Sequence, residues 1–446
     1  MAVWLVPDNP EPADALFASA LAMTAGLALA PLLAGLRDPR AFLRGEHLLA
    51  LAPVYWLLLD PLQGAYEFDG IASAEVRTAI IGIGLFVVAV WAGALQRPWK
   101  APAAVVRAAS TELSANAYFR VTVFAFMLGM LTFAIPSDFN VPEMIRYLGQ
   151  PRWANPWNRG QLGGWNAFLD HLQYFGYLLP ALTVIVARRA GWWDPRSLLS
   201  VAMSLVMSLF LAQGGGRRII GVIFGMALVL WILTQTVVKA RQVVTLALAA
   251  GLLLAALQVM LAYRSVGLGV AFAERGVAVQ KVRYLHVDDN LYRFCQIIQL
   301  IPQTHAFVHH RYVIWVLVRP IPRVLWPGKP TDPGFDLSAA LGREGVSYAC
   351  SAIGEFYMSA GLLGIALGGW LYGRLSGVAT GLLTQKATFG SYVVYSALMM
   401  SLFAGVRSML ELVLISYVVL AWVGLSSLAT RLGGRQRVAP ARSVVT

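Results

Sequence analysis

The sequence predicts an all-α polytopic membrane protein. Of its 446 residues, 58% are hydrophobic and only 13% are charged, with a mean hydropathy of +0.65. Soluble domains are instead about 45–50% apolar and about 25% charged. Apolar runs of about 17 to 25 residues, long enough to cross a hydrocarbon core of about 30 Å, recur along the chain. The weak alternation typical of membrane barrel strands is missing, so the spans are expected to be helices.

We expect about eleven membrane spans by this length criterion. They lie near residues 15–35, 47–62, 78–96, 118–136, 166–187, 197–213, 219–238, 243–262, 352–372, 390–406 and 409–428. The second span is the least regular, because His47, Asp60 and two prolines interrupt it. The chain is thereby divided into eight spans within 1–262, a long loop at 263–351, three spans within 352–430 and a tail at 431–446.

Lysine and arginine gather in alternate loops, which predicts the side of the membrane for each loop, since cytoplasmic loops are enriched in these residues. The cationic loops hold Arg37, Arg40, Arg44, Arg97, Lys100, Arg107, Arg188, Arg189, Arg196, Lys239, Arg241, Arg374 and Lys386. The loop with Asp60, Glu67, Asp69 and Glu75 is acidic, as is the N-terminus. We therefore expect the N-terminus outside and the C-terminus inside. The N-terminus lacks a positive n-region, so no cleaved signal peptide is expected.

The formal net charge of +13 indicates an anionic partner. The positive residues are scattered between apolar runs, so anionic lipid head groups or an anionic lipid-linked substrate fit them better than nucleic acid. Cys295 and Cys350 are the only cysteines, which is too few for a thiol metal cluster. The sequence leaves open whether these two residues pair.

Four segments on the predicted outer side carry arginines against the usual charge bias. They are the loop with Arg146, Arg152 and Arg159, the turn around GGGRR, the long segment from Tyr263 to Ile353 and the turn around Arg407. One explanation is that these side chains snorkel to lipid head groups or lie in solvent. The other is that several arginines on one face, each beside a helix end, form an anion site.

Two pieces of the long outer segment are expected to be helical. The stretch DDNLYRFCQIIQLIP has apolar residues at helical spacing, and Asp288 and Asp289 lie near its N-terminal end, where negative charge suits the helix dipole. It predicts an amphipathic helix on the membrane surface or across the end of the bundle. RYVIWVLV, at 311–318, is apolar but too short to span, and is a second interfacial or re-entrant candidate.

GGGRRIIG, at 214–221, is the first candidate for a phosphate site. Its glycines allow a sharp turn and close approach of a ligand, and Arg217 and Arg218 begin the next helix, where free N–H groups and the dipole favour an anion. The alternative is a tight helical hairpin with two snorkelling arginines.

RPIPRVLWPGKPTDPGFD is the second candidate. Five prolines fix its backbone and hold Arg319, Arg323 and Lys329 at set positions. Arginine makes bidentate bonds to phosphate oxygens, so a pyrophosphate between these arginines and Arg217 is one reading. A rigid outer loop kept soluble by its cations is the other.

The stretch SAIGEFYMSAGLLGIALGGWLYG begins a span. Gly361, Gly364 and Gly368 make one helix face nearly smooth, which favours close packing of a neighbouring helix over chemistry. Glu355 stands at the membrane boundary beside the cationic loop. It is a candidate general base, an arginine partner or a plain helix-end carboxylate.

Arg407 lies four residues before Glu411, which predicts either a boundary ion pair or a third arm of the anion site. The outer loop also holds His305, His309 and His310. No HExxH or comparable carboxylate pattern accompanies them, so we expect no metal. One of these histidines is instead a candidate proton acceptor for a sugar hydroxyl.

Together these motifs resemble the oligosaccharide repeat-unit polymerases of the O-antigen polymerase type. The shared features are a GGGRR-type turn leading into a span, a large outer loop ending in IPRVLWPGKP, the GEFYMSAGLLG helix entry and an arginine in the last outer turn. They cover mainly residues 210–230 and 315–375, with weaker support at 400–412. Ser359 stands where the family pattern is expected to have Asn, which leaves the role of that position open.

The resemblance implies a metal-independent, cofactor-free, GT-C-like glycosyltransferase of the bacterial inner membrane. Such an enzyme moves a growing glycan from undecaprenyl pyrophosphate onto a new lipid-linked repeat unit on the periplasmic side. Its expected partners are the lipid-linked donor and acceptor, membrane lipids and a chain-length regulator, without nucleic acid.

The resemblance also implies roles for individual residues. The expected pyrophosphate ligands are Arg217, Arg218, Arg319, Arg323 and Arg407, which would stabilise leaving-group charge. The candidates for activating the acceptor hydroxyl are Glu355, His309 and His310, and the further substrate contacts are Arg264, Lys329 and Tyr357.

Two other functions remain in competition. An O-antigen ligase shares the donor but transfers glycan to lipid A core, and an essential loop histidine would favour it. A lipid or polysaccharide transporter predicts polar residues at mid-bilayer in paired broken helices. The cations of this chain lie at one face instead, which favours surface chemistry.

Overall fold

The structure is a computed structural model in which every regular element of the described residues is helical. It describes residues 1–151, 154–157, 168–213, 216–235, 240–263, 267, 284–285, 287–343, 348–385 and 387–432. Arg264 and most of the predicted tail lie outside these ranges.

The first half of the chain forms the helices α1 to α11. Their bounds are α1 Phe17–Arg37, α2 Gly45–Pro53, α3 Ser73–Ala94, α4 Ala103–Ala109, α5 Ala115–Ala134, α6 Val141–Leu148, α7 Leu169–Tyr177, α8 Leu179–Ala190, α9 Pro195–Gln213, α10 Arg217–Leu233 and α11 Ala240–Tyr263. Short turns of 3-10 helix join them at η1 Ala2–Leu5, η2 Pro39–Leu43, η4 Pro61–Gln63 and η5 Ile135–Ser137, and η3 Val54–Leu58 is a π-helix.

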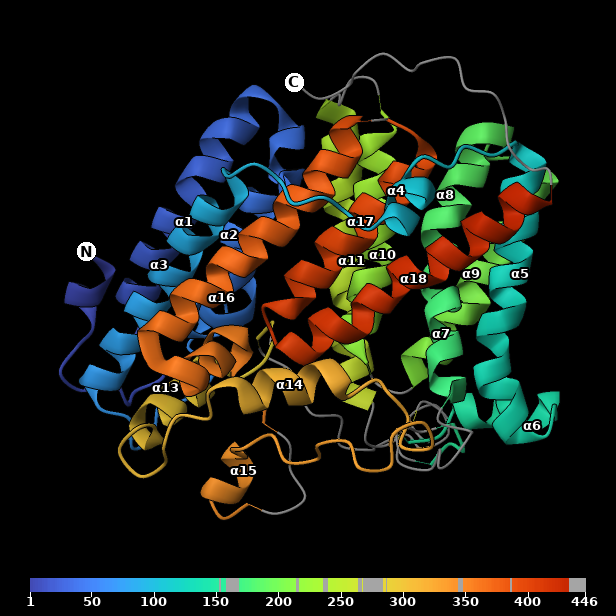
Figure 1. Cartoon of the computed structure of the whole chain (residues 1–446). Coiled ribbons are helices and arrows are strands. Elements are labelled where there is room, and N and C mark those ends of the chain that lie inside the picture. The colour runs from blue at the N-terminus through green and yellow to red at the C-terminus, as the bar shows by residue number, and fades with distance from the viewer. Residues whose placement is uncertain are drawn as a thin grey trace, which may run out of the picture.

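The second half contributes the helices α13 to α18. Their bounds are α13 Asn290–Leu300, α14 His310–Val318, α15 Leu337–Ala340, α16 Ser351–Gln385, α17 Phe389–Gly405 and α18 Met409–Arg431. The helices α13 and α14 lie across one end of the bundle, with α15 below them (Figure 1). Both helices expected in the long outer segment are therefore present.

Six helices are long and apolar enough to cross a membrane by length and composition: α1, α3, α5, α9, α16 and α18. This agrees with an α-helical membrane protein, but the predicted count of eleven spans is not confirmed. The predicted span at 243–262 is the 24-residue helix α11, which is not among these six, and α10 and α17 have 17 residues each. The second predicted span is α2 followed by the π-helix, and the fifth is divided into α7 and α8, which meet at Leu178 ahead of Pro180.

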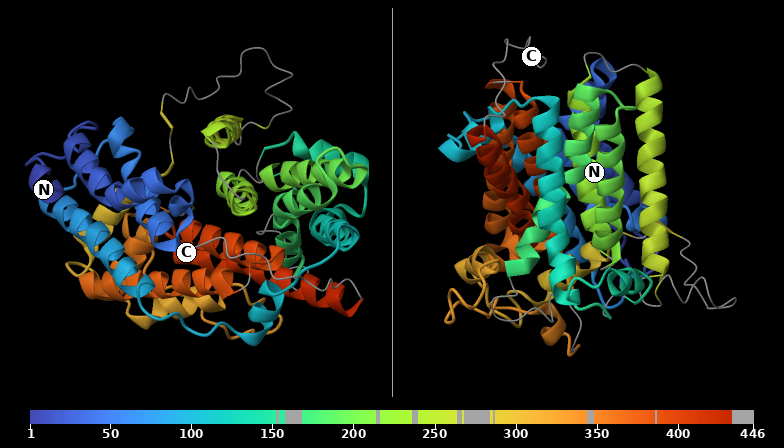
Figure 2. Two further views of the ribbon diagram at one scale, coloured as in Figure 1. Left: turned by 90° about the horizontal axis from the view of Figure 1, so that it is seen from above. Right: turned by 90° about the vertical axis from the view of Figure 1, so that its right-hand side faces the viewer.

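The helices pack as two groups joined by a third. Helix α3 packs on α16, with α2 and α13 against the same pair, while α5 packs with α7, α8 and α9. Helices α17 and α18 pack on each other and run between the two groups, and α10 packs against α17 and α8 (Figure 2). Helix α11 packs against α10 at the periphery of the bundle.

Glycines let α3 and α16 approach each other closely. A Cβ atom at Gly373 would lie 2.0 Å from the carbonyl oxygen of Val90, and one at Gly93 would lie 2.2 Å from that of Trp370. Such distances are too short for any side chain, so only glycine fits at these positions. The backbones of α3 and α16 are thus in direct contact at these two positions.

Helix α16 is two helical segments divided by a break. Ala360 and Gly361 leave the helical region, and Gly361 has a φ of 62°, which favours glycine. The first segment folds back, because a Cβ at Gly364 would lie 2.1 Å from the carbonyl oxygen of Phe356, whose ring covers Gly368. The glycine face thus serves packing, as expected, but its partner is the preceding turn of the same chain. The helical run that contains the predicted span at 352–372 is therefore broken at Gly361 and continues to Gln385.

The two ends of the bundle separate the loops as the charge pattern predicts. Helix α4 and the end of α18 lie at one end, whereas α6, α13, α14 and α15 lie at the other (Figure 1). The starts of α10 and α18 lie at this second end, so the arginine-bearing outer segments share one face. The assignment of this face to the outside remains a prediction from charge.

Gly373→Ala is expected to lower the melting temperature of the protein in detergent, because the new methyl group would meet the Val90 carbonyl oxygen. Overpacking of this kind costs about 1–3 kcal/mol. Gly424→Ala in α18 is the matched control, since nothing lies within 4 Å of its Cβ position. Thermal unfolding followed by size-exclusion chromatography measures both variants. Equal melting temperatures would contradict the close α3–α16 contact.

Candidate functional site

A cavity of about 660 Å³ lies between α10, α11, α17 and the π-helix of the second predicted span. Apolar side chains of α10 and α11 form most of its wall, together with Tyr55, Trp56 and Phe403. Its charged residues come from the end of the bundle where α10 begins, and they are Arg217, Arg218, Asp288 and Arg407. We call this the arginine cavity. It is amphipathic, with a long apolar wall and a cationic end.

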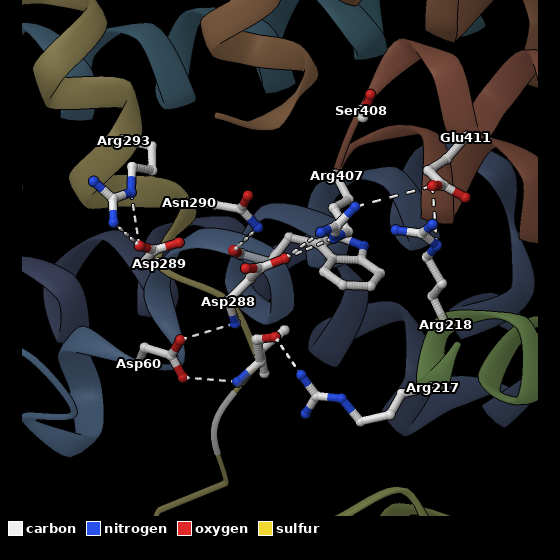
Figure 3. Close-up of polar contacts among 12 residues, drawn as sticks. Asp60, Arg217, Arg218, Asp288, Asp289, Asn290, Arg293, Arg407, Ser408 and Glu411 are labelled. Carbon is white, nitrogen blue, oxygen red and sulfur yellow. Dashed lines mark hydrogen bonds and ion pairs between the residues drawn. The ribbon is translucent and has the colours of Figure 1, made fainter. Parts of the chain in front are cut away.

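Carboxylates pair with Arg218 and Arg407 at the cationic end, and a backbone carbonyl oxygen accepts from Arg217 (Figure 3). The Nη2 and Nε atoms of Arg407 lie 2.6 and 2.7 Å from Oδ2 of Asp288. The Nε atom of Arg218 lies 3.0 Å from Oε1 of Glu411, which is also 3.9 Å from Nη1 of Arg407. Arg217 donates to the carbonyl oxygen of Val287 at 3.3 Å. The predicted Arg407–Glu411 pair is therefore present, but Asp288 is the closer partner of Arg407.

Burial would by itself lower the pKa of Arg407, but the carboxylates of Asp288 and Glu411 raise it above its ordinary value. The guanidinium is therefore held in its charged form inside the protein. An uncompensated cation here would be costly, since desolvation disfavours a lone buried charge.

Turns at helix ends place these arginines. Arg217 and Arg218 begin α10 directly after Gly216, so their guanidinium groups lie at the start of the helix. Arg407 lies in the short turn between α17 and α18, and the Ser408 hydroxyl caps α18 by accepting from the N–H of Leu410 at 3.2 Å. Because α10 and α17 run in opposite directions, the start of one meets the end of the other. The start of α10 and the turn before α18, distant in sequence, thus meet at one cavity.

Asp60 fixes the segment that carries Asp288. Its Oδ1 and Oδ2 atoms accept the backbone N–H groups of Val287 and Asp288 at 3.1 and 3.0 Å. Its side chain is only 2% exposed. In the sequence, Asp60 stands out as an interruption of the second span and as a member of the acidic outer loop, not as a site residue. The useful signal in the sequence was an acidic residue beside a proline at the outer end of that span.

Glu355 lies close to the site without lining the cavity. Its Oε1 atom accepts from the hydroxyl groups of Tyr312 and Ser408, each at 2.7 Å, and its Oε2 atom accepts the N–H of Met409 at 2.6 Å. It is 3% exposed. Burial and the neighbouring Glu355 raise the pKa of Tyr312 well above its ordinary value, so this phenol stays a donor. The carboxylate therefore ties α14 and α16 to the turn that holds Arg407, and its role as a base stays a prediction.

His309 and His310 line a different cavity of about 330 Å³, together with His305 and Arg311. The backbone N–H of His309 bonds to the carbonyl oxygen of Ser359 at 3.0 Å, beside the break in α16. The two cavities share no lining residue. The structure therefore does not bring these histidines together with Arg217, Arg218 and Arg407.

Arg319, Arg323 and Lys329 lie beyond the end of α14 and do not line the arginine cavity. The ammonium of Lys329 bonds to the carbonyl oxygens of Arg319 and Ile321 at 3.0 and 2.5 Å. Burial and the charges of the two arginines lower its pKa. Lys329 thus closes the proline-rich loop upon itself.

The remaining predicted contact, Tyr357, is largely buried, and its ring packs against Phe294 and Phe307. Cys295 and Cys350 are buried free thiols, so they do not pair. Among the described residues, no group of histidine, cysteine and acidic side chains could hold a metal ion.

No protein-family model, curated protein sequence or solved structure matches the chain.

Asp60→Ala is expected to destabilise the fold, because it leaves the N–H groups of Val287 and Asp288 buried without an acceptor. Each such group costs about 1–3 kcal/mol. Asp60→Asn retains one acceptor oxygen, so it should lower the melting temperature less than Asp60→Ala does. Asp69→Ala, at an exposed position of the same loop, is the control. Thermal unfolding in detergent ranks the variants, and an Asp60→Ala melting temperature equal to that of the control would refute the role of Asp60.

Proposed function

We propose that the protein is an integral-membrane glycosyltransferase that polymerises lipid-pyrophosphate-linked oligosaccharide repeat units at the periplasmic face of a bacterial inner membrane. One observation carries the proposal: Arg217, Arg218 and Arg407 gather at the charged end of a cavity whose walls are apolar. A lipid-linked pyrophosphate has the same division of polarity. Its isoprenoid chain would contact the apolar wall, and its pyrophosphate would contact the arginines.

The arginines suit the leaving group of such a transfer. Negative charge develops on the pyrophosphate as the bond to the sugar breaks, and donors aimed at that charge stabilise the transition state. A guanidinium carries five N–H donors in a fixed fork, so it can hold phosphate oxygens bidentately. The site needs no metal for this charge stabilisation.

The resting ion pairs are compatible with this role. Arg407 engages Asp288 through Nε and Nη2 and has Nη1 3.9 Å from Glu411, which also engages Arg218. A doubly charged phosphate competes well with carboxylates for such guanidinium donors. The carboxylates therefore hold the arginines charged and oriented before the donor arrives.

The proline-rich loop with Arg319 and Arg323 remains the proposed second arm, since α14 lies at the same end of the bundle (Figure 1). The proposed partners are the lipid-linked donor and acceptor, membrane lipids and a chain-length regulator. Transfer of the glycan to lipid A core, as by a ligase, is the competing outcome of the same assay.

Arg217→Gln, Arg218→Gln and Arg407→Gln are each expected to slow polymerisation. Loss of one charged hydrogen bond of about 1.5–3 kcal/mol lowers kcat/KM roughly 10- to 100-fold. Purified variants are incubated with undecaprenyl-pyrophosphate-linked repeat units, and gels report ladders of increasing length. Arg146→Gln is the control, because this arginine pairs with Glu143 on the surface of α6.

Several outcomes would contradict the proposal. A ladder made by the triple arginine variant would exclude the arginine cavity as the site, and a ladder abolished by chelator would exclude a metal-independent reaction. Transfer to core lipid without a ladder would favour the ligase. Arg319→Gln and Arg323→Gln test the second arm separately.

Sidedness gives an independent prediction. Val141→Cys in α6 and Trp193→Cys between α8 and α9 introduce thiols at exposed positions, whereas the native thiols of Cys295 and Cys350 are buried. In intact cells with a permeable outer membrane, a membrane-impermeant maleimide is expected to label position 141 and to leave position 193 unlabelled until the cells are lysed. The reverse pattern would place the arginine cavity on the cytoplasmic side.

A further inference from the structure

The arginine cavity contains a carboxylate with no role yet in the proposed reaction. Among the described residues that line it, Asp288 is the one acidic side chain. The side chain is 24% exposed, so a bound molecule can reach it. The other charged groups among the described lining residues are the guanidinium groups, which stay protonated and cannot accept a proton.

The position of Asp288 is set from two sides. Its backbone N–H is held by buried Asp60, and its Oδ2 atom receives both bonds from Arg407. Its Oδ1 atom takes no part in those two bonds. Asp288 is therefore a fixed carboxylate with one oxygen outside its ion pair, as Figure 3 illustrates.

The other candidate bases do not share this placement. Both oxygens of Glu355 accept bonds from protein groups. Glu411 is bonded to Arg218 and does not line the cavity. His309 and His310 line the other cavity. Of these candidate bases, Asp288 is the one that both lines the arginine cavity and contacts Arg407, a residue proposed to bind the pyrophosphate.

The chemistry of glycosyl transfer makes this proximity meaningful. The sugar carbon under attack is bonded directly to a pyrophosphate oxygen, so a group that binds the pyrophosphate also lies near the reacting carbon. Arg407 touches Asp288 at 2.6 Å, and in the proposed function it also touches the leaving group. The carboxylate and the reacting carbon are then separated by about the width of one guanidinium. A hydroxyl that attacks this carbon therefore lies within hydrogen-bond distance of the Asp288 carboxylate.

We propose that Asp288 is the general base that activates the acceptor hydroxyl of the sugar. This inference rests on the proposed function. The hydroxyl proton passes to the Asp288 carboxylate as the hydroxyl oxygen forms a bond to the anomeric carbon. The bond from that carbon to the pyrophosphate oxygen breaks, and its electron pair leaves with the pyrophosphate, whose charge the arginines stabilise. The protonated Asp288 then returns its proton to solvent.

Asp288→Asn separates catalysis from donor binding. The amide cannot take the proton, so the transfer rate should fall roughly 100- to 10,000-fold, the usual contribution of a general base. It also removes a negative charge beside Arg407, so the Kd for undecaprenyl pyrophosphate should stay the same or decrease. Asp288→Glu keeps a carboxylate and should retain part of the activity. Asp289→Asn is the matched control, because Asp289 pairs with Arg293 outside the cavity.

The measurements are ladder formation with lipid-linked repeat units and calorimetric titration with sugar-free undecaprenyl pyrophosphate. Slow transfer with retained binding in Asp288→Asn, together with a near-normal control, supports the general base. An Asp288→Asn variant that polymerises as fast as the wild type, or that loses binding in proportion to its rate, overturns it and leaves Asp288 as a counter-ion of Arg407. A wild-type protein that makes no ladder overturns the proposed function itself, which is a separate result.

Discussion

The bonds made by the two residues Val287 and Asp288 hold the site together. Their backbone N–H groups bond to Asp60, the Val287 carbonyl oxygen accepts from Arg217, and the Asp288 side chain pairs with Arg407. Four parts of the chain, more than 300 residues apart at the extremes, are thereby joined within one layer at the end of the bundle (Figure 3). Buried backbone donors and buried cations both require partners, and this short segment supplies them together.

Packing of the long helices positions the residues of this site. The glycine contacts bring α3 and α16 together, and the break at Gly361 turns the first segment of α16 back over the second. Glu355 is thus presented to the turn before α18, where it accepts from Ser408 and Met409 next to Arg407. A glycine pattern that looks remote from chemistry therefore determines where one arginine of the site can lie.

The charge arrangement also explains how cations are kept beside an apolar cavity. Each arginine of the cluster has a protein partner in the resting structure. An uncompensated cation would be costly to bury, and these partners offset that cost.

The sequence by itself determined the helical membrane class, the helices in the long outer segment and the grouping of outer arginines on one face. These follow from run length, periodicity and loop charge, which are local properties of the chain. It also pointed to the Arg407–Glu411 pair, because i and i+4 are neighbours on a helix. Only the tertiary structure decided that Arg217, Arg218 and Arg407 share a cavity, that His309 and His310 do not, and that Asp60 and Asp288 belong to the site. Those relations join residues far apart in sequence, and no periodicity encodes which helix ends meet once close packing has set their positions.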